Sequence, residues 1–304
     1  MSESRVRLAG AMMAMAAAIA FSGKAIIIKL AYRHQVDPVT LLTLRMLMSA
    51  PLFMLLGWWA ARDGTAPPLS GSDRVNIALL GLVGYYLASY FDFLGLQHVT
   101  AALERLLLFI HPTFVLLIAA AIFKRPITRH DMLAIVLSYV GIAVAFGHDL
   151  ATQPGNVALG SFWVLMSALF YAIYLLGSGR LVGRVGSLRF SAQAGLASCI
   201  GVIVHYLVTQ EVATILSQPA EVYWLSLLMA AACTVLPIAL MSEGIRRIGS
   251  SHASIIGSVG PIATIFLGFI FLDEPITAVQ LLGAGLVMAG VLAISLQKAK
   301  PRAA

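Results

Sequence analysis

The sequence predicts an all-α integral membrane protein in which ten transmembrane helices form two five-helix repeats of inverted topology. The prediction rests on three observations: an apolar composition, ten apolar runs long enough to cross a membrane, and one stretch that occurs twice. Of the 304 residues, 60% are hydrophobic and only 11% are charged, whereas about 25% are charged in soluble globular proteins. The chain is therefore expected in a lipid bilayer.

The ten spans follow from the length of the apolar runs between polar breaks. A hydrocarbon core about 30 Å thick requires about 20 helical residues. Cut on this scale, the chain gives spans at residues 8–31, 38–59, 74–97, 101–123, 128–147, 157–178, 188–208, 220–243, 250–272 and 275–296.

The first span could be read as a cleaved signal peptide. It follows Arg5 and Arg7, and Ala14-Met15-Ala16 matches a cleavage site. The apolar run nevertheless continues to Leu30, and its removal would leave the first repeat one helix short. We interpret it as a retained helix.

Helix-capping residues precede several of the later spans. Asp37 with Pro38 marks the start of the second span, because Asp caps helices and Pro fits the first helical position. Further candidate caps are Ser72 or Asp73 for the third span, Thr100 for the fourth, Asn156 for the sixth and Ser187 for the seventh. Pro112, Pro237 and Pro261 lie inside spans and predict kinks in helices four, eight and nine.

The repeat links residues 109–147 to residues 258–296 at a constant spacing of 149 positions. The matching pairs are Pro112 and Pro261, Pro126 and Pro275, Ile127 and Ile276, Thr128 and Thr277, Leu133 and Leu282, Leu137 and Leu286, and Gly141 and Gly290. These matches predict two units, residues 1–150 and 151–304. The charge before each Pro-Ile-Thr turn differs, since Lys124-Arg125 is replaced by Asp273-Glu274.

The distribution of basic residues predicts the orientation. Lys and Arg gather at the two termini and in the even-numbered connections, whereas the odd-numbered connections hold only Arg33. By the positive-inside rule, both termini are cytoplasmic. A unit of five helices must then insert upside down the second time, which puts Asp273-Glu274 on the outer side. Inverted repeats of this kind are typical of secondary transporters.

These features together resemble the EamA-type transporters of the drug/metabolite transporter superfamily. The resemblance covers nearly the whole chain and rests on the ten spans, the duplicated unit, the run Asp273-Glu274-Pro275-Ile276-Thr277 and the run Gly244-Ile245-Arg246-Arg247-Ile248-Gly249. It implies a bacterial inner-membrane carrier, often an exporter of amino acids or other small metabolites. The chain departs from the family pattern at Lys124-Arg125, where many members are acidic, and at Ser22-Gly23, where Trp-Gly is frequent.

Ionisable side chains inside the spans are candidate site residues. Each costs about 2.5–3.5 kcal/mol at the centre of a helix. All of them lie in the first repeat, and they are Lys24, Lys29, Arg45, Asp92, Glu104 and Arg105. Arg45 lies seven residues past Pro38, about 10 Å into the bilayer. Lys24 is preferred over Lys29, which lies near the rim and is expected to snorkel.

Polar and aromatic side chains at helical spacing extend this candidate site. Three faces are polar: one with Tyr85, Ser89 and Asp92, one with Glu104 and His111, and one with Trp163, Ser167 and Tyr171. The predicted substrate-binding residues are Lys24, Arg45, Tyr85, Ser89, Asp92, Glu104, His111, Trp163, Ser167 and Tyr171.

Other functional classes lack their motifs. The chain has no Walker loop, no G-x-G-x-x-G, no H-E-x-x-H and no His/Cys cluster with metal spacing. No basic patch with interleaved aromatics points to nucleic acid. Cys199 and Cys233 lie in apolar runs, where they act as small apolar residues. We expect no enzyme activity, no cofactor and transport driven by gradients, in a monomer or homodimer.

The sequence therefore predicts a carrier of amino acids, with protons as candidate coupling ion. Lys24 and Arg45 would hold an anionic group, and Asp92 or Glu104 a cationic group or the proton. Tyr85, Trp163 and Tyr171 would contact the apolar body. Two alternatives remain open. A carrier of organic anions or sugar phosphates fits the surplus of basic residues, and a scaffold or receptor would pair its charges and leave no cavity.

Overall fold

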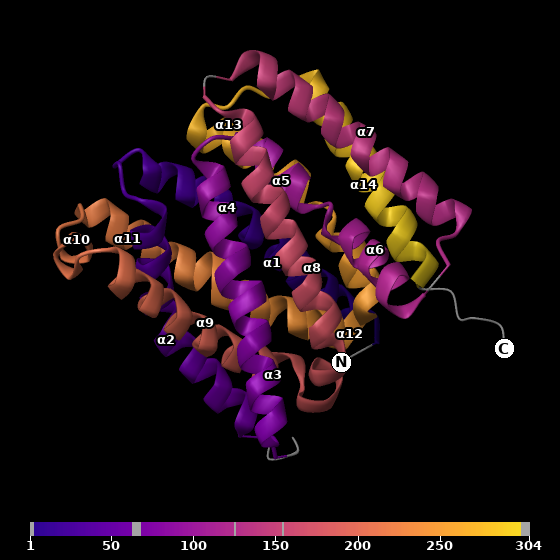
Figure 1. The fold of residues 1–304 in the computed structure, drawn as a ribbon. Coiled ribbons are helices and arrows are strands. Elements are labelled where there is room, and N and C mark those ends of the chain that lie inside the picture. Colours follow the sequence, from indigo (N-terminus) through magenta and orange to yellow (C-terminus); the bar gives the residue numbers. More distant parts are fainter. Residues whose placement is uncertain (1–2, 63–67, 125, 154, 299–304) are drawn as a thin grey trace.

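The computed structural model describes residues 3–62, 68–124, 126–153 and 155–298. Arg125, Lys300 and Arg302 of the predicted basic clusters lie outside the described residues, as do the side chains of Arg5 and Lys298. All regular structure in the described part is helical (Figure 1). The elements are α1 (Glu3–Tyr32), α2 (Pro38–Ala61), α3 (Gly71–Gly81), η1 (Leu82–Leu87), α4 (Ala88–Leu96), α5 (Ala101–Leu108), α6 (His111–Phe123), α7 (Arg129–Thr152), α8 (Val157–Val185), α9 (Ser187–Thr209), α10 (Val212–Leu216), α11 (Ala220–Ala230), η2 (Ala231–Val235), α12 (Leu236–Gly257), α13 (Gly260–Leu272) and α14 (Ala278–Lys298).

The helices group into membrane-spanning segments that follow the predicted order. In the described part of the chain, nine segments are long and apolar enough to cross a membrane: Val6–Tyr32, Pro38–Ala61, Gly71–Leu96, Ala101–Phe123, Arg129–Thr152, Val157–Val185, Ser187–Thr209, Ala220–Gly249 and Ile255–Leu272. A shorter apolar helix, Ala278–Ala293, occupies the place of the predicted tenth span. The fold class is thus confirmed as an all-helical membrane protein.

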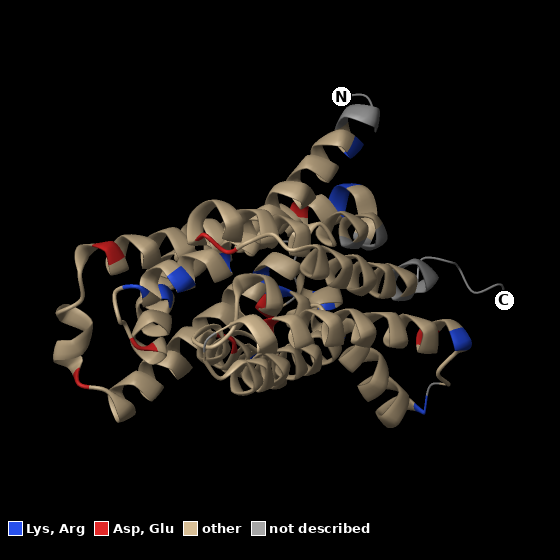
Figure 2. Ribbon diagram, turned by 90° about the horizontal axis from the view of Figure 1, so that it is seen from above, with Lys and Arg blue, Asp and Glu red and all other residues tan. Residues whose placement is uncertain are grey.

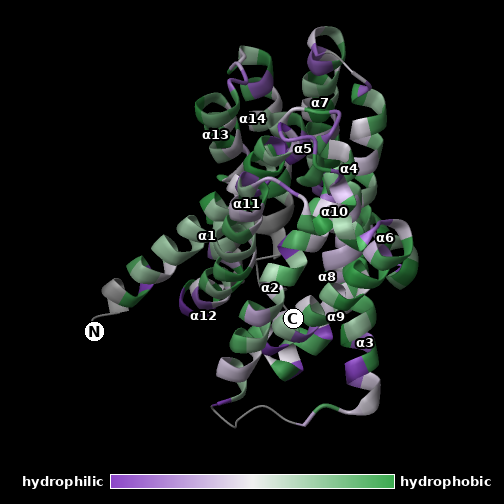
Figure 3. Ribbon diagram, turned by 90° about the vertical axis from the view of Figure 1, so that its left-hand side faces the viewer, coloured by the Kyte–Doolittle hydropathy of each residue, from purple (hydrophilic) through white to green (hydrophobic). Residues whose placement is uncertain are grey.

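The outer surface of the helices is apolar. Large hydrophobic side chains such as Leu55, Ile200, Leu207 and Phe269 are more than half exposed. Hydrophilic segments gather in the connections and at helix ends (Figure 3), and charged residues are sparse along the helices (Figure 2). In water such a surface would be unfavourable, whereas in lipid it is the expected exterior.

Three of the predicted helix caps are confirmed. The side chains of Asp37, Thr100 and Asn156 each accept a hydrogen bond from the backbone N–H three residues later, at 2.9, 3.1 and 3.0 Å. Each bond satisfies one of the N–H groups that a helix start leaves without a partner.

Two of the predicted caps are wrong. The third span is capped by Ser70, and Asp73 is its third helical residue, where its carboxylate accepts from Ser70 N at 3.0 Å in a capping box. Ser72 lies inside the helix. The seventh span begins after Gly186, whose φ of 84° is favourable only for glycine, and Ser187 is already helical. In both cases the N-cap lies before the residue that the apolar pattern indicated.

The prolines of spans four and nine start new helices instead of kinking continuous ones. Helix α5 ends at Leu108 and α6 begins at His111, so Pro112 occupies the first turn of α6. Pro261 has the equivalent place in α13, after α12 ends at Gly257. Pro at this position loses no hydrogen bond. Both prolines therefore lie in the first turn of a helix that follows a break in the chain of helical residues.

The internal repeat extends beyond the stretch that sequence matches revealed. The two π-helices, η1 and η2, begin at Leu82 and Ala231, which are 149 positions apart. Lys124 and Asp273, also 149 apart, both adopt the left-handed conformation with φ of 50° and 60°. Equivalent residues of the two units thus share unusual backbone geometry.

Helices α7 and α14, the fifth span of the first unit and the last helix of the second, lie side by side (Figure 1). Gly141 of α7 lies against Gly283, and Gly290 of α14 lies against Ala134. Residue numbers rise along one helix as they fall along the other, so the two helices are antiparallel. A Cβ atom on Gly141 would lie 2.7 Å from the Gly283 carbonyl oxygen, which explains why this contact requires glycine.

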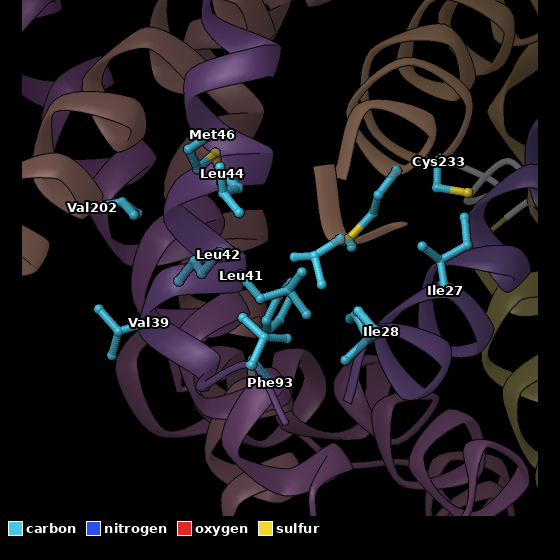
Figure 4. Close-up of a cluster of buried hydrophobic side chains, with 14 of the residues drawn as sticks. Ile27, Ile28, Val39, Leu41, Leu42, Leu44, Met46, Phe93, Val202 and Cys233 are labelled. Atoms are coloured by element: carbon cyan, nitrogen blue, oxygen red, sulfur yellow. The ribbon is translucent and has the colours of Figure 1, made fainter. Parts of the chain in front are cut away.

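The largest buried apolar cluster joins both units. It contains Ile28 of α1, Leu41 and Leu42 of α2, Phe93 of α4 and Val202 of α9 (Figure 4). All five side chains are less than 4% exposed. This cluster fixes α1, α2 and α4 relative to one another, and these helices carry most of the intramembrane charges.

Candidate functional site

A cavity of about 390 Å³ lies between the two units. Its walls come from α1, α2, α5, α6, α8 and α12, together with the π-helices and the start of α4. Seven of the ten predicted site residues line it, namely Lys24, Arg45, Tyr85, Ser89, His111, Ser167 and Tyr171. Asp92, Glu104 and Trp163 are not among the lining residues. The structure therefore brings most of the predicted site together.

The two π-helices supply equivalent parts of the cavity wall. Gly84 and Cys233 line it, as do Tyr85 and Thr234, and the members of each pair are 149 positions apart. A π segment widens the helical turn and is frequent at functional sites. The hydroxyl of Thr234 donates to the carbonyl of Met229 at 2.9 Å, five residues earlier, which satisfies an acceptor in the widened turn.

Lys24 forms a buried ion pair behind the cavity surface. Its Nζ lies 2.5 Å from Asp92 Oδ2, and the Asp92 side chain is only 1% exposed. Opposite charges removed from water are tolerated only when they pair closely. Asp92 thus does not line the cavity, but it binds Lys24, which does.

Glu104 lies in the same layer as Asp92. It is fully buried, and it interacts with Asp92, Lys24 and Arg105. No described N–H group donates to either Glu104 oxygen or to Asp92 Oδ1. Two carboxyl groups therefore stand next to one another behind Lys24.

Two arginines reach the cavity wall without a direct ion pair to a carboxylate of the described chain. Arg45 is only 4% exposed and stacks over Phe93, with Cζ 5.1 Å from the ring centre. Arg105 stacks over Phe109 at 5.6 Å and lies 3.4 Å from the hydroxyl of Ser22. The Nε of each arginine has no hydrogen-bond acceptor among the described residues. Arg105 was considered from sequence as an intramembrane charge, but the predicted site did not include it.

The aromatic wall differs from the predicted one. Trp163 stacks on Phe91, with ring centres 5.5 Å apart and planes at 5°, away from the cavity lining. The cavity is lined instead by Phe21, Phe53 and Phe109, besides Tyr85 and Tyr171. Phenylalanines within apolar spans carry no polar signal, so sequence reasoning had no means of selecting them.

Hydrogen bonds fix the polar aromatic residues of the cavity. Tyr174 donates to the Tyr85 hydroxyl at 3.2 Å, and Tyr85 donates to Ser191 at 3.4 Å. His111 Nδ1 lies 2.9 Å from the Leu108 carbonyl. These contacts hold Tyr85 and His111 in place, because their polar atoms already have partners.

One end of the bundle is closed by polar contacts between the units. Glu274, from the second unit, accepts from the backbone N–H of Ala101 with both oxygens, at 3.1 and 3.2 Å, and lies 3.5 Å from Lys29 Nζ. Lys29 also donates to the Val99 carbonyl at 2.7 Å, and Tyr32 donates to the Phe93 carbonyl at 2.7 Å. The carboxylate thus caps α5, where the helix dipole favours negative charge.

A second depression lies outside this closed end. It is lined by polar side chains that include Lys29, Asp37, Gln97 and Glu274, and it shares no lining residue with the cavity. On α1, Lys24 lines the cavity and Lys29 lines this depression, about 7.5 Å apart along the helix axis. The intervening layer separates the two spaces.

A cavity that has basic and aromatic side chains in its wall and lies between two related helical units in a membrane is the arrangement of a transporter. Residues 8–147 and 158–296 each match the EamA-like transporter family. The chain belongs to this family and is a membrane transporter.

Two relatives are similar to this chain along nearly their whole length. The transporter YcbK of Bacillus subtilis, which is uncharacterized, is 31% identical over 303 residues, covering 98% of this chain and 96% of its own. The uncharacterized transporter sll1319 of Synechocystis is 24% identical over 98% of this chain and 96% of its own. A solved crystal structure matches with a TM-score of 0.62 over 99% of this chain and all of the other, at 15% identity, which shows the fold alone.

Proposed function

We propose that this protein is a secondary transporter that moves a small polar metabolite by alternating access, as an exporter in a bacterial inner membrane. The proposal assigns ten spans to two inverted halves, residues 1–150 and 151–304, with both termini in the cytoplasm. The observation that carries it is the cavity to which both halves contribute equivalent residues. The antiparallel packing of α7 on α14 supports the inverted arrangement.

The contacts around Glu274 define the conformational state. They join the two halves at the end that the basic residues assign to the outside, whereas the lining residues Met241 and Ser242 lie in the part of α12 that leads to the cytoplasmic Arg246-Arg247 pair. We propose that this state is closed outside and receives substrate from the cytoplasm. Rocking of the two halves would then break the Glu274 contacts and open the outer end.

Two substrate classes are candidates. An amino acid would place its carboxylate at Lys24 and Arg45, with Tyr85 and Tyr171 beside its side chain. An organic anion would use the same bases without needing an acid. For coupling, Asp92 and Glu104 are the candidate proton carriers, because adjacent buried carboxyl groups repel one another when both are ionised and can share a proton.

Transport in reconstituted liposomes tests this function. Under an imposed pH gradient, liposomes with the protein should accumulate labelled amino acids or organic carboxylates above the level of protein-free liposomes. Glu104→Gln and Asp92→Asn should each reduce accumulation at least tenfold, whereas Asp273→Asn, at an exposed carboxylate, should not. Full activity of both buried variants would remove the acids from the mechanism, and no accumulation of either class would contradict the function.

Reporter fusions test the inverted arrangement. A periplasm-active reporter fused after Thr128 should be inactive, and the same reporter fused after Thr277 should be active. Activity on the same side for both fusions would contradict the two inverted halves.

A further inference from the structure

We propose that the substrate is an organic carboxylate that lacks an ammonium group and carries an aromatic or branched apolar body. Arg45 and Arg105 would hold its carboxylate. This inference rests on the proposed transport function and selects one of its two substrate classes.

The charged side chains at the cavity wall all have the same sign. Among the described lining residues, Lys24, Arg45 and Arg105 are basic, and none is Asp or Glu. Lys24 is already paired with Asp92. No carboxylate of the described chain lies within 4.0 Å of either guanidinium. Asp92 acts on Arg45, and Glu104 on Arg105, only at longer range. Both guanidinium groups can therefore contact a carboxylate of a ligand.

The Arg45 guanidinium is buried. Arg45 is 4% exposed, and its Nε lacks an acceptor among the described residues. Stacking over Phe93 offsets only part of the cost of removing a charge from water. A carboxylate in the cavity would supply both the opposite charge and the missing acceptor, since guanidinium and carboxylate match in shape.

The two acids that could bind an amino group of the substrate do not line the cavity. Asp92 Oδ2 is bound to Lys24, and Glu104 is fully buried outside the lining. Neither carboxylate lines the cavity, so an ammonium group bound there would have no direct contact with an acid of the described lining. It would also approach three positive charges. The cavity thus disfavours a zwitterion relative to the corresponding anion.

The rest of the lining fits an apolar body. Rings of Phe21, Phe53 and Phe109 and side chains of Met46 and Ile238 face the cavity. Its volume of about 390 Å³ lies within the range of small-molecule sites, about 300–1,000 Å³. A compound with one carboxylate and a phenyl or branched alkyl group would occupy both regions.

A matched ligand series tests this assignment on the intact protein in detergent. 3-Phenylpropanoate, phenylalanine, phenethylamine and 3-phenylpropanamide share one body and differ in charge, and 4-methylpentanoate, leucine and isopentylamine form the branched series. We expect one of the two anions to bind about 10- to 100-fold more tightly than its zwitterion, amine or amide, as measured by ligand-induced thermal stabilisation and titration calorimetry.

Variants of the two arginines test their role. Arg45→Gln and Arg105→Gln should each weaken anion binding about 10- to 100-fold, and Arg45→Lys should restore part of it. The control is Arg62→Gln, because Arg62 also stacks on an aromatic ring, Trp58, at 4.9 Å, but is exposed. Its anion binding should be unchanged.

The outcomes separate this inference from the transport function. Tighter binding of the zwitterion or amine, no binding of either anion to folded protein, or unchanged binding in both arginine variants would overturn the inference. If liposomes exchange amino acids but not the anions, the transport function stands and the anion assignment fails. If the anions bind but do not cross the membrane, the assignment stands and the transport function fails.

Discussion

The stability of this helical bundle depends on how each charged residue in its interior is paired. Lys24 and Asp92 lie 2.5 Å apart with side chains 17% and 1% exposed, whereas Arg33 and Asp273 lie 3.8 Å apart with side chains 52% and 93% exposed. Removing one partner of a buried pair leaves an uncompensated charge, which costs far more than the loss of an exposed pair. The two pairs therefore offer a comparison within one molecule.

We predict that Lys24→Met destabilises the protein by about 3–5 kcal/mol, because Asp92 then remains as an unpaired buried charge. The double variant Lys24→Met/Asp92→Asn should recover much of this loss. Thermal unfolding in detergent measures both. Arg33→Gln serves as the control and should melt close to the wild type. Equal melting of Lys24→Met and Arg33→Gln would contradict the importance of the buried pair.

At the residue scale, the sequence pointed to cavity-lining positions where a charged side chain inside a span was costly. Lys24 and Arg45 could be predicted because a charge in an apolar span requires a reason, and both line the cavity. Phe21 and Phe53 could not be predicted, since an apolar ring satisfies a lipid-facing position equally well. The side of each helix that faces the interior depends on packing against the other helices, which cannot be read from the sequence.

Among the elements, the close packing of α7 against α14 depends on glycines, which have no side chain. Gly141 permits contact with Gly283, whereas a Cβ atom added to Gly147, on the same helix, would meet only open space. A substitution at the first site must push the helices apart, and the same substitution at the second need not. Small residues of this kind allow membrane helices to approach closely.

We predict that Gly141→Val destabilises the protein by about 1–3 kcal/mol through overpacking. Gly147→Val is the matched control and should have a much smaller effect. Midpoints of thermal unfolding, compared in the same detergent, would measure the difference. A similar loss at both positions would point to helix propensity instead of packing as the cause.

Some helix breaks could be predicted from the sequence, whereas the π-helices could not. Pro112 and Pro261 predicted kinks in spans four and nine. The structure instead has separate helices, with one of these prolines in the first turn of each. The π-helices at Leu82–Leu87 and Ala231–Val235 had no such signal, because a π segment requires no particular residue type. Their equivalence became visible only from the backbone.

For the whole molecule, the decisive feature is the asymmetry between its two ends. Glu274 ties the second unit to the start of α5 at one end, and the cavity extends toward the other. The chain has only two cysteines, and Cys233 lines the cavity whereas Cys199 is buried elsewhere. In a Cys199→Ala background, Cys233 therefore reports access to the cavity.

We predict that Cys233 in this background reacts with a membrane-impermeant maleimide added from the cytoplasmic side and is protected from the outside. Adding Glu274→Ala should raise labelling from the outside severalfold, because the contacts with Ala101 and Lys29 are lost. Asp273→Ala, an exposed neighbour, should leave the outside labelling low. Unchanged protection in Glu274→Ala would show that other contacts close this end.

The common register of the two π-helices extends the spacing of 149 positions to the charged residues of the first unit. A π-helix contains one residue more than the α-helical turn it replaces, so the same extra residue is present at the same place in both units. At this spacing, the counterparts of Arg45 and Arg105 are the neutral residues Ala194 and Ser254. The two units therefore share backbone geometry but not charge, and the bases of the cavity wall all come from the first unit.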